Sequence, residues 1–354
     1  MARVKINSNY FVVSKKLDNI RYFFKRGHTL RLAWDRLKWH WLPKYGIAPR
    51  FPQTVDIETS LGCQLRCPMC SREQMVSKFA GGGNMNYDMY KAIIDECAAN
   101  NVFSIKLSWR GEPTVHPRLI DMVRYAKDKG IKDVAFLTNG GLLNEERTRA
   151  LIDAGVDWIS FSIDGMYEDY ERIRKPITFP QIVETVKRIH TIKKTEGRTK
   201  PLVRIQTISG ALERNPDYFS FWEPWVDRIS VIAEQHRDQP ELIKHDPDYV
   251  CQSPFQRVFI TWDGKIAPCH GDYHLHHNMG RFGEVSIKEA WDGEKFRKLR
   301  HDMWNKDRLQ YEACRLCADG GEYVGDKLNI DGRTIPVIRY LENEDAKADM
   351  KSAS

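Results

Sequence analysis

The chain has 354 residues, of which 42% are hydrophobic, enough for one large domain and a smaller one. Its net charge is +7, but residues 1–50 carry twelve Lys and Arg against two Asp, a local charge of +10 that leaves −3 for residues 51–354. A nucleic-acid-binding protein would spread its cations over the folded domains, so this distribution excludes a general nucleic-acid partner. Eight cysteines without a secretory signal predict a cytoplasmic location.

The basic N-terminal segment interleaves cations with aromatic residues over positions 15–44. Leu30, Trp34, Leu37 and Trp41 fall at helical spacing, which predicts an amphipathic helix. Such a helix could lie on the inner face of an anionic membrane, which would suggest a carbohydrate or lipid-linked substrate, or it could pack its tryptophans onto the rest of the chain. The sequence has no apolar run of eighteen residues, so we expect peripheral contact and no membrane span.

From residue 54 onward, β-rich runs alternate with helix-length amphipathic segments, which predicts a parallel α/β sheet. The expected strands are 55–59, 104–109, 134–138, 158–163, 203–208 and 229–233, and the expected helices are 87–100, 117–129, 144–154, 179–196 and 215–224. The alternation does not separate an open sheet from a partial barrel. In either case the active site gathers beyond the carboxyl ends of the strands.

Three cysteines follow the first strand directly, in the spacing Cys63-x3-Cys67-x2-Cys70. Three thiolates on one loop can hold three irons of a 4Fe–4S cube and leave the fourth iron without a protein ligand. The alternatives are a zinc knuckle or unrelated buried thiols. Cys97, in the helix that follows, is predicted to be a buried, inert thiol.

Four more cysteines define a second unit, residues 251–325, after a polar linker at 235–250. Asp263-Gly264 predicts a hairpin turn within 261–268, and a helix is expected near 286–300. Four thiols form a closed site for a 4Fe–4S cluster or for zinc. The ligands would be Cys251, Cys269, Cys314 and Cys317. Residues 326–354 are predicted to form a C-terminal tail.

The cysteine triplet, together with Arg110-Gly111-Glu112-Pro113 after the second strand, resembles the radical S-adenosylmethionine (SAM) superfamily. The turn departs from the family's Gly-Gly-Glu-Pro motif at Arg110. The second unit is similar to the truncated SPASM, or twitch, module. The resemblance implies a partial (β/α)6 barrel over residues 51–234, two 4Fe–4S clusters, and SAM chelated to the open iron and cleaved to a 5′-deoxyadenosyl radical. It also implies an electron donor such as flavodoxin or ferredoxin.

The resemblance further implies a set of SAM contacts at the strand ends. The Gly-Glu-Pro turn would receive the ammonium group, two strand ends would hold the ribose and the carboxylate, and an arginine on the fifth strand would pair with the carboxylate. Turn chemistry, helix caps and a structural salt bridge are the alternatives. The residues are Gly111, Glu112, Pro113, Asn139, Ser162, Asp164 and Arg204.

Full ligation of the second cluster leaves it no iron for substrate, so it would serve as an electron acceptor. That favours dehydrogenation of a hydroxylated small molecule such as a sugar, cyclitol or conjugate, with His270 or Asp272 as the base; epimerisation is the nearest rival. One alternative is a maturase of a ribosomal peptide or protein, although residues before 54 are too few and too basic for a leader-binding domain. Another is a non-catalytic zinc-binding adaptor.

Overall fold

The computed structural model describes residues 3–4, 10–12, 16–70, 72, 83–232, 244–321, 323–330 and 333–340. A nine-stranded sheet forms its centre, in the order β10-β9-β3-β4-β5-β6-β7-β8-β2. Six strands, β3 to β8, are parallel and adjacent in chain order, which confirms the predicted α/β architecture. Their bounds are Thr54–Ile57, Ser104–Lys106, Asp133–Thr138, Trp158–Ser162, Leu202–Ile208 and Arg228–Ile232.

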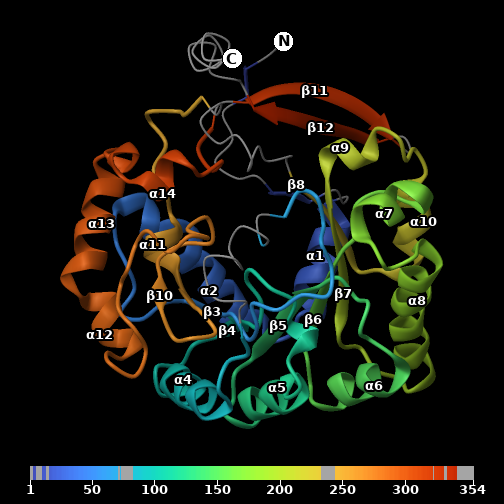
Figure 1. Ribbon diagram of the computed structural model, residues 1–354, viewed down its shortest axis with the longest axis horizontal. Helices are drawn as coiled ribbons and strands as arrows, with labels where there is room; N and C mark the ends of the chain where they lie inside the picture. The colour runs from blue at the N-terminus through green and yellow to red at the C-terminus, as the bar shows by residue number, and fades with distance from the viewer. Residues whose placement is uncertain are drawn as a thin grey trace.

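Helices cover the outer side of this sheet (Figure 1). Each buries one face: α5, for instance, buries Leu119, Met122, Val123 and Ala126, which are spaced three or four residues apart. Helix α4 buries Cys97 completely, as predicted. These helices are α4 (Tyr87–Ala99), α5 (Leu119–Asp128), α6 (Glu145–Asp153), α7 (Tyr167–Arg174), α8 (Phe179–Thr195), α9 (Ser209–Leu212) and α10 (Tyr218–Trp222).

The second cysteine unit continues the same sheet. Its first strand, β9 (Arg257–Ile260), pairs in parallel with β3, and β10 (Ile266–Ala267) turns back antiparallel through the predicted Asp-Gly turn. The pairing of β9 with β3 was not predicted, because it joins strands about 200 residues apart. The helices of this unit are α11 (Ser253–Gln256), α12 (Ile287–Asp292), α13 (Glu294–Trp304) and α14 (Glu312–Arg315).

The N-terminal segment covers the amino-terminal end of the sheet. Arg26, just beyond α1 (Lys16–Lys25), forms a 2.7 Å ion pair with Asp133, the first residue of β5. Trp39 of α2 (Thr29–Trp41) packs against Arg257, the first residue of β9. Helices α1 and α2 therefore lie at the end opposite to the cysteine triplet, and strand β2 (Tyr10–Val12) pairs with β8 at the sheet edge.

Two predicted boundaries differ from the structure. Residues 323–330 and 333–340, largely assigned above to a C-terminal tail, form the antiparallel strands β11 (Tyr323–Ile330) and β12 (Arg333–Tyr340), and β1 (Arg3–Val4) pairs with β11 (Figure 1). Of the predicted linker, 244–250 packs on the second unit through a His245 hydrogen bond to the Arg315 carbonyl. Residues 233–243 and 341–354 lie outside the described range. No helix in the described part is long and apolar enough to span a membrane.

Candidate active site

The three cysteines of the triplet occupy the loop that leaves the carboxyl end of β3. Burial raises the pKa of Cys63 to about 11 and also raises the pKa of Cys67. Smaller increases come from the neighbouring thiols, from Cys67 for Cys63 and from Cys70 for Cys67, so these thiols lie within electrostatic range of each other. Thiolates in such a setting need positive charge beside them, which iron ions provide. The donor set therefore fits a 4Fe–4S cluster.

The end of β5 approaches Cys63 through Asn139. The Asn139 side chain donates to Cys63 Sγ at 3.7 Å and exchanges two hydrogen bonds with the Gln64 side chain, at 2.9 and 3.3 Å. Asn139 was predicted to contact SAM, and the structure places it against a cluster ligand. Its role as a SAM contact stays a prediction.

Arg174 at the end of α7 contacts Cys67 in the same way. Its Nη1 donates to Cys67 Sγ at 3.6 Å, and its Nη2 forms an ion pair with Asp164. Asp164 Oδ1 also accepts the Ile208 backbone N–H at 3.0 Å. Asp164, predicted as a ribose contact, thus also positions an arginine that stabilises negative charge on Cys67.

The Gly-Glu-Pro turn lies directly against the start of the cysteine loop. The Glu112 N–H donates to the Gly62 carbonyl at 2.8 Å. The buried Glu112 carboxylate accepts hydrogen bonds from Thr114, Thr138 and the Asn139 backbone, so it fixes the turn to the end of β5. Burial raises the pKa of Glu112. These donors hold the carboxylate in place, and the role of the turn as a contact for the SAM ammonium group stays a prediction.

Gly111→Ala is expected to reduce SAM cleavage at least tenfold and to lower iron occupancy. An alanine Cβ at this position would lie 2.2 Å from the Ser60 carbonyl oxygen and 2.7 Å from Leu61 Cα, so the cysteine loop would have to move. Gly62→Ala is the matched control, because its Cβ meets only side-chain atoms, at 3.1 Å or more. Iron analysis and 5′-deoxyadenosine formation measure both effects, and equal behaviour of the two variants would contradict the prediction.

Two other predicted SAM contacts occupy different positions. Ser162 ends β6, two residues before Asp164, at the same edge as the cysteines. Arg204 lies elsewhere: its guanidinium stacks 4.5 Å from the ring centre of Trp158, the first residue of β6, whose indole N–H points to Asp133. Arg204 therefore faces the amino-terminal end of the sheet. It lies apart from the other predicted SAM contacts, and its role as a SAM contact stays a prediction.

Arg110, the departure from the family motif, joins the barrel to the second unit. Its guanidinium forms two 2.7 Å bonds with Glu58, and both side chains are 1% exposed or less. It also donates to the Tyr273 carbonyl at 3.0 Å, while Glu58 accepts the Trp262 N–H at 3.2 Å. A buried pair with these extra bonds fixes the loop that carries Cys269 above the triplet edge.

The four cysteines of the second unit converge. Burial raises the pKa of Cys269 most, Asp272 raises it next, and Cys317, Cys251 and Cys314 raise it further, so the four thiols lie within electrostatic range of one another. Gly271 lets the chain pass close to one of them, because a Cβ there would lie 2.9 Å from Cys317 Sγ. In the described residues no three His, Cys, Asp or Glu side chains are arranged to hold a single metal ion. The donor set fits an auxiliary 4Fe–4S cluster.

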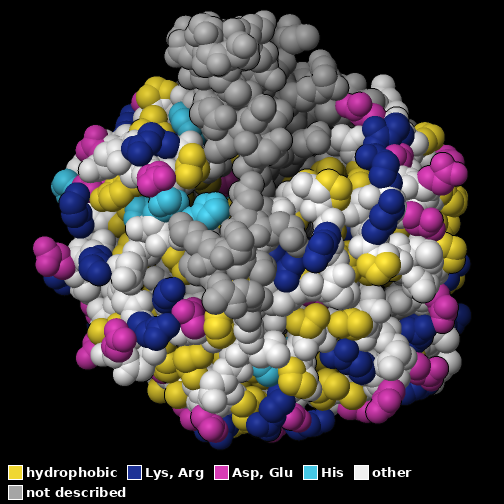
Figure 2. All heavy atoms as spheres, viewed as in Figure 1, with side chains coloured by type: hydrophobic (Ala, Val, Ile, Leu, Met, Phe, Trp, Pro, Cys, Tyr) yellow, Lys and Arg dark blue, Asp and Glu magenta, His cyan; other side chains and the backbone are white. Residues whose placement is uncertain are grey.

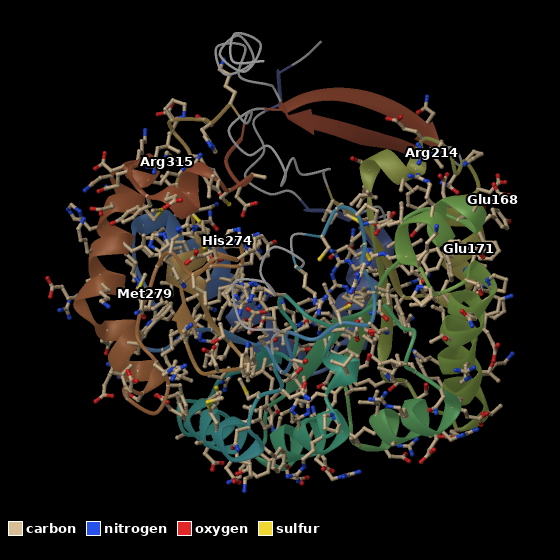
Figure 3. The ribbon with its side chains drawn as sticks, in the orientation of Figure 1. Glu168, Glu171, Arg214, His274, Met279 and Arg315 are labelled. Carbon is tan, nitrogen blue, oxygen red and sulfur yellow. The ribbon has the colours of Figure 1, made fainter. Side chains whose placement is uncertain are left out.

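The predicted bases lie on the loop after Cys269. Asp272 is 1% exposed, and its two oxygens accept the backbone N–H groups of His276 and His277, so it braces this loop. His270 is half-exposed and lies 3.4 Å from Asp319. Figure 2 shows histidine side chains grouped on this face, and His274 lies on the inner side of the unit in Figure 3. Of the two predicted bases, only His270 has an exposed side chain.

Sequence reasoning missed two residues that shape the site, Gln64 and the partner of Arg110, Glu58, and it offered Arg174, together with Arg172, only as a weaker phosphate or carboxylate contact. Gln64 stands inside the triplet, a position that signals proximity to the cluster. Arg174 lies 107 residues from Cys67, and Glu58 lies 52 residues from Arg110, so only the parallel strand order brings them together. An interrupting charge at the end of an apolar strand, as at Glu58, is the one signal that could have indicated a buried partner.

Comparisons with known proteins agree with this site. Residues 57–199 match the family model of the radical SAM superfamily, and residues 251–318 match that of the SPASM iron–sulfur cluster-binding domain. A PqqA peptide cyclase from Rhodopseudomonas palustris is 33% identical over 309 residues, covering 75% of this chain and 79% of the relative. A tungsten-containing aldehyde ferredoxin oxidoreductase cofactor-modifying protein from Pyrococcus furiosus is 24% identical, covering 74% and 86%.

Solved structures show the same fold. BtrN in complex with AdoMet and 2-DOIA has a TM-score of 0.53 at 16% identity, covering 81% of this chain and 98% of BtrN. SuiB of Streptococcus suis bound to S-adenosylmethionine has a TM-score of 0.53 at 14% identity, covering 83% and 76%. Because both family models match and the 33% identical relative is covered over 79% of its length, the chain belongs to the radical SAM superfamily and carries a C-terminal SPASM iron–sulfur domain.

Proposed function

We propose that this protein is a radical SAM enzyme that modifies a peptide. The observation that carries the proposal is the 33% identity to a PqqA peptide cyclase, because the match covers 79% of that relative. The similarity of fold to SuiB, which has also been solved bound to the precursor peptide SuiA, is consistent with it. The peptide alternative is therefore preferred over oxidation of a sugar or cyclitol, whose remaining support is a likeness of fold to BtrN at 16% identity.

The chain's own residues suit this chemistry. The triplet thiols would hold a cluster that can supply the electron for SAM cleavage, and the four auxiliary thiols would hold a cluster that can accept an electron from the substrate. Asn139 and Arg174 hold Cys63 and Cys67 by hydrogen bonds to sulfur. The backbone of the Gly-Glu-Pro turn would receive the SAM ammonium group, and Ser162 and Asp164 its ribose. His270, whose side chain is half-exposed next to Cys269, would accept a proton from the substrate.

The test is incubation of anaerobically purified protein with SAM, a reductant and peptides encoded by short reading frames beside its gene. We expect a peptide to stimulate 5′-deoxyadenosine formation at least tenfold and to become lighter by two hydrogen atoms. Flavodoxin or ferredoxin should replace dithionite as the electron donor. Mass spectrometry of the peptide and chromatography of 5′-deoxyadenosine are the measurements.

A parallel incubation with sugars, cyclitols and their conjugates separates the alternatives. Stimulation by one of these and by no peptide would overturn the proposal in favour of small-molecule oxidation. Protein that is purified without oxygen, binds two zinc ions and contains no iron would support the non-catalytic adaptor.

A further inference from the structure

The N-terminal helices present an apolar face that the described chain does not cover. Among the described residues eleven large hydrophobic side chains are exposed, and eight of them lie between positions 20 and 47. Concentration in so short a segment distinguishes them from the scattered exposed hydrophobic residues of ordinary surfaces. We call these eight the apolar face: Ile20, Phe24, Leu30, Trp34, Leu37, Trp41, Tyr45 and Ile47.

The structure fixes α2 so that this face points away from the sheet. Leu30 and Trp34 are 88% and 58% exposed, whereas Leu32 and Asp35 on the opposite side are buried. Gln53 Nε2 donates to the Asp35 backbone carbonyl at 2.9 Å, which anchors the inner side of the helix. The helix is therefore already docked, and its outer side is available to another surface.

A basic pocket of about 460 Å³ lies next to the apolar face, beginning at the residue that follows Ile47. The pocket holds four cations and one carboxylate, and Lys288 is already paired with that carboxylate, Asp292. Arg300 Nη2 is buried without a hydrogen-bond partner among the described residues. An anion would satisfy this group. The lining residues are Ala48, Pro49, Arg50, Lys288, Trp291, Asp292, Arg297 and Arg300.

The apolar face and the pocket are continuous. Ile47 of the face directly precedes Ala48 of the pocket. Trp304, itself 43% exposed, belongs to the same helix, α13, as Arg297 and Arg300, and a Cβ on Gly46 would lie 3.0 Å from its ring. Aromatic and aliphatic side chains beside an arginine-rich anion pocket match the two layers of a membrane surface, its acyl boundary and its phosphate groups.

We propose that the apolar face and the basic pocket bind the surface of an anionic phospholipid membrane. The tryptophans and Leu30 would enter the interface, and the pocket would receive a lipid phosphate. The cations on α1 and α2 add a long-range attraction to negatively charged lipid. This proposal is independent of the substrate.

Membrane binding through this face sets the orientation of the enzyme. Helices α1 and α2 contact the first residues of β5 and β9, whereas the cysteine loop follows the last residue of β3. The active site thus opens away from the bilayer. A substrate in the aqueous phase can reach it, so membrane binding here does not require a lipid-linked substrate.

The test is flotation of the full anaerobic holoenzyme with vesicles of phosphatidylcholine alone or mixed with phosphatidylglycerol. We expect flotation with the mixed vesicles only. The exposed triple variant L30S/W34S/W41S and the pocket variant R50E/R297E should each lower the bound fraction at least tenfold. Matched controls at the opposite, carboxyl end of the sheet are Tyr167→Ser, at an exposed aromatic, and R118E/R172E, at exposed cations; both should bind like the wild type.

Failure of the wild type to float with either vesicle would overturn the proposal, as would equal flotation of all variants. A third outcome also overturns it. In that case the wild type does not float, and light scattering shows a dimer that the triple serine variant converts to a monomer. A second copy of the chain would then cover the apolar face. The pocket variant could also bind vesicles as fully as the wild type while the triple serine variant does not. If inorganic phosphate then protects the arginines of the wild-type pocket from chemical modification, the pocket binds free phosphate and its proposed role in lipid binding is wrong.

Discussion

Replacing Cys63, Cys67 and Cys70 together with alanine abolishes SAM cleavage and leaves about half of the iron. The wild type should carry about eight irons, because three thiols hold one 4Fe–4S cube and four hold another. The auxiliary cysteines share no described hydrogen bond with the triplet, so their cluster should survive. We expect 5′-deoxyadenosine formation to fall by more than a thousandfold, since the other described cysteines are the four auxiliary ones, which would ligate every iron of their cluster, and Cys97.

The matched control is Cys97→Ala, which removes a completely buried thiol from α4. Burial raises the pKa of Cys97, so its side chain is neutral. Its loss should lower the free energy of unfolding by roughly 1 kcal/mol, because packing is lost, without affecting the iron content. Iron analysis with EPR of the reduced protein, with and without SAM, distinguishes the variants. A triple alanine variant that still shows a SAM-sensitive signal would contradict the assignment of the open cluster.

The chemistry-bearing loops could be predicted because their signals are local. The triplet, the Gly-Glu-Pro turn and the Asp263-Gly264 hairpin each lie within a few residues, and strand alternation fixed the edge at which they meet. The predicted hairpin and the six parallel strands agree with the structure.

What the sequence did not reveal depends on contacts between distant segments. The parallel pairing of β9 with β3 and the approach of Arg174 to Cys67 join residues more than 100 positions apart. Arg204 is a different case. Its alternation with Gln206 indicated a polar face of β7, and both residues are half-buried. The end of the barrel that its side chain reaches depends on Trp158 of the neighbouring strand. Periodicity gives the face of a strand and not the direction of a long side chain.

Arg110→Ala is expected to lower the thermal midpoint of the holoenzyme and to uncouple SAM cleavage from product formation. Removing one member of a buried ion pair leaves Glu58 without its main partner and costs about 3–5 kcal/mol, which corresponds to a decrease of roughly 5–10 °C. The loop that Arg110 fixes through the Tyr273 carbonyl carries Cys269, so the auxiliary cluster loses its fixed position relative to the triplet. Circular dichroism under anaerobic conditions measures the first effect, and the ratio of 5′-deoxyadenosine to product measures the second.

A double variant separates stability from docking. Arg110→Met with Glu58→Leu replaces the buried charges with apolar side chains, and such replacements recover much of the lost stability. They cannot restore the bonds to the Tyr273 carbonyl or from the Trp262 N–H, so the ratio of 5′-deoxyadenosine to product should remain high. Lys91→Ala, which removes an exposed ion pair with Asp88, should shift neither quantity. If the double variant regains normal coupling, the Arg110–Glu58 pair contributes only to stability, and the position of the auxiliary cluster depends on the pairing of β9 with β3 instead.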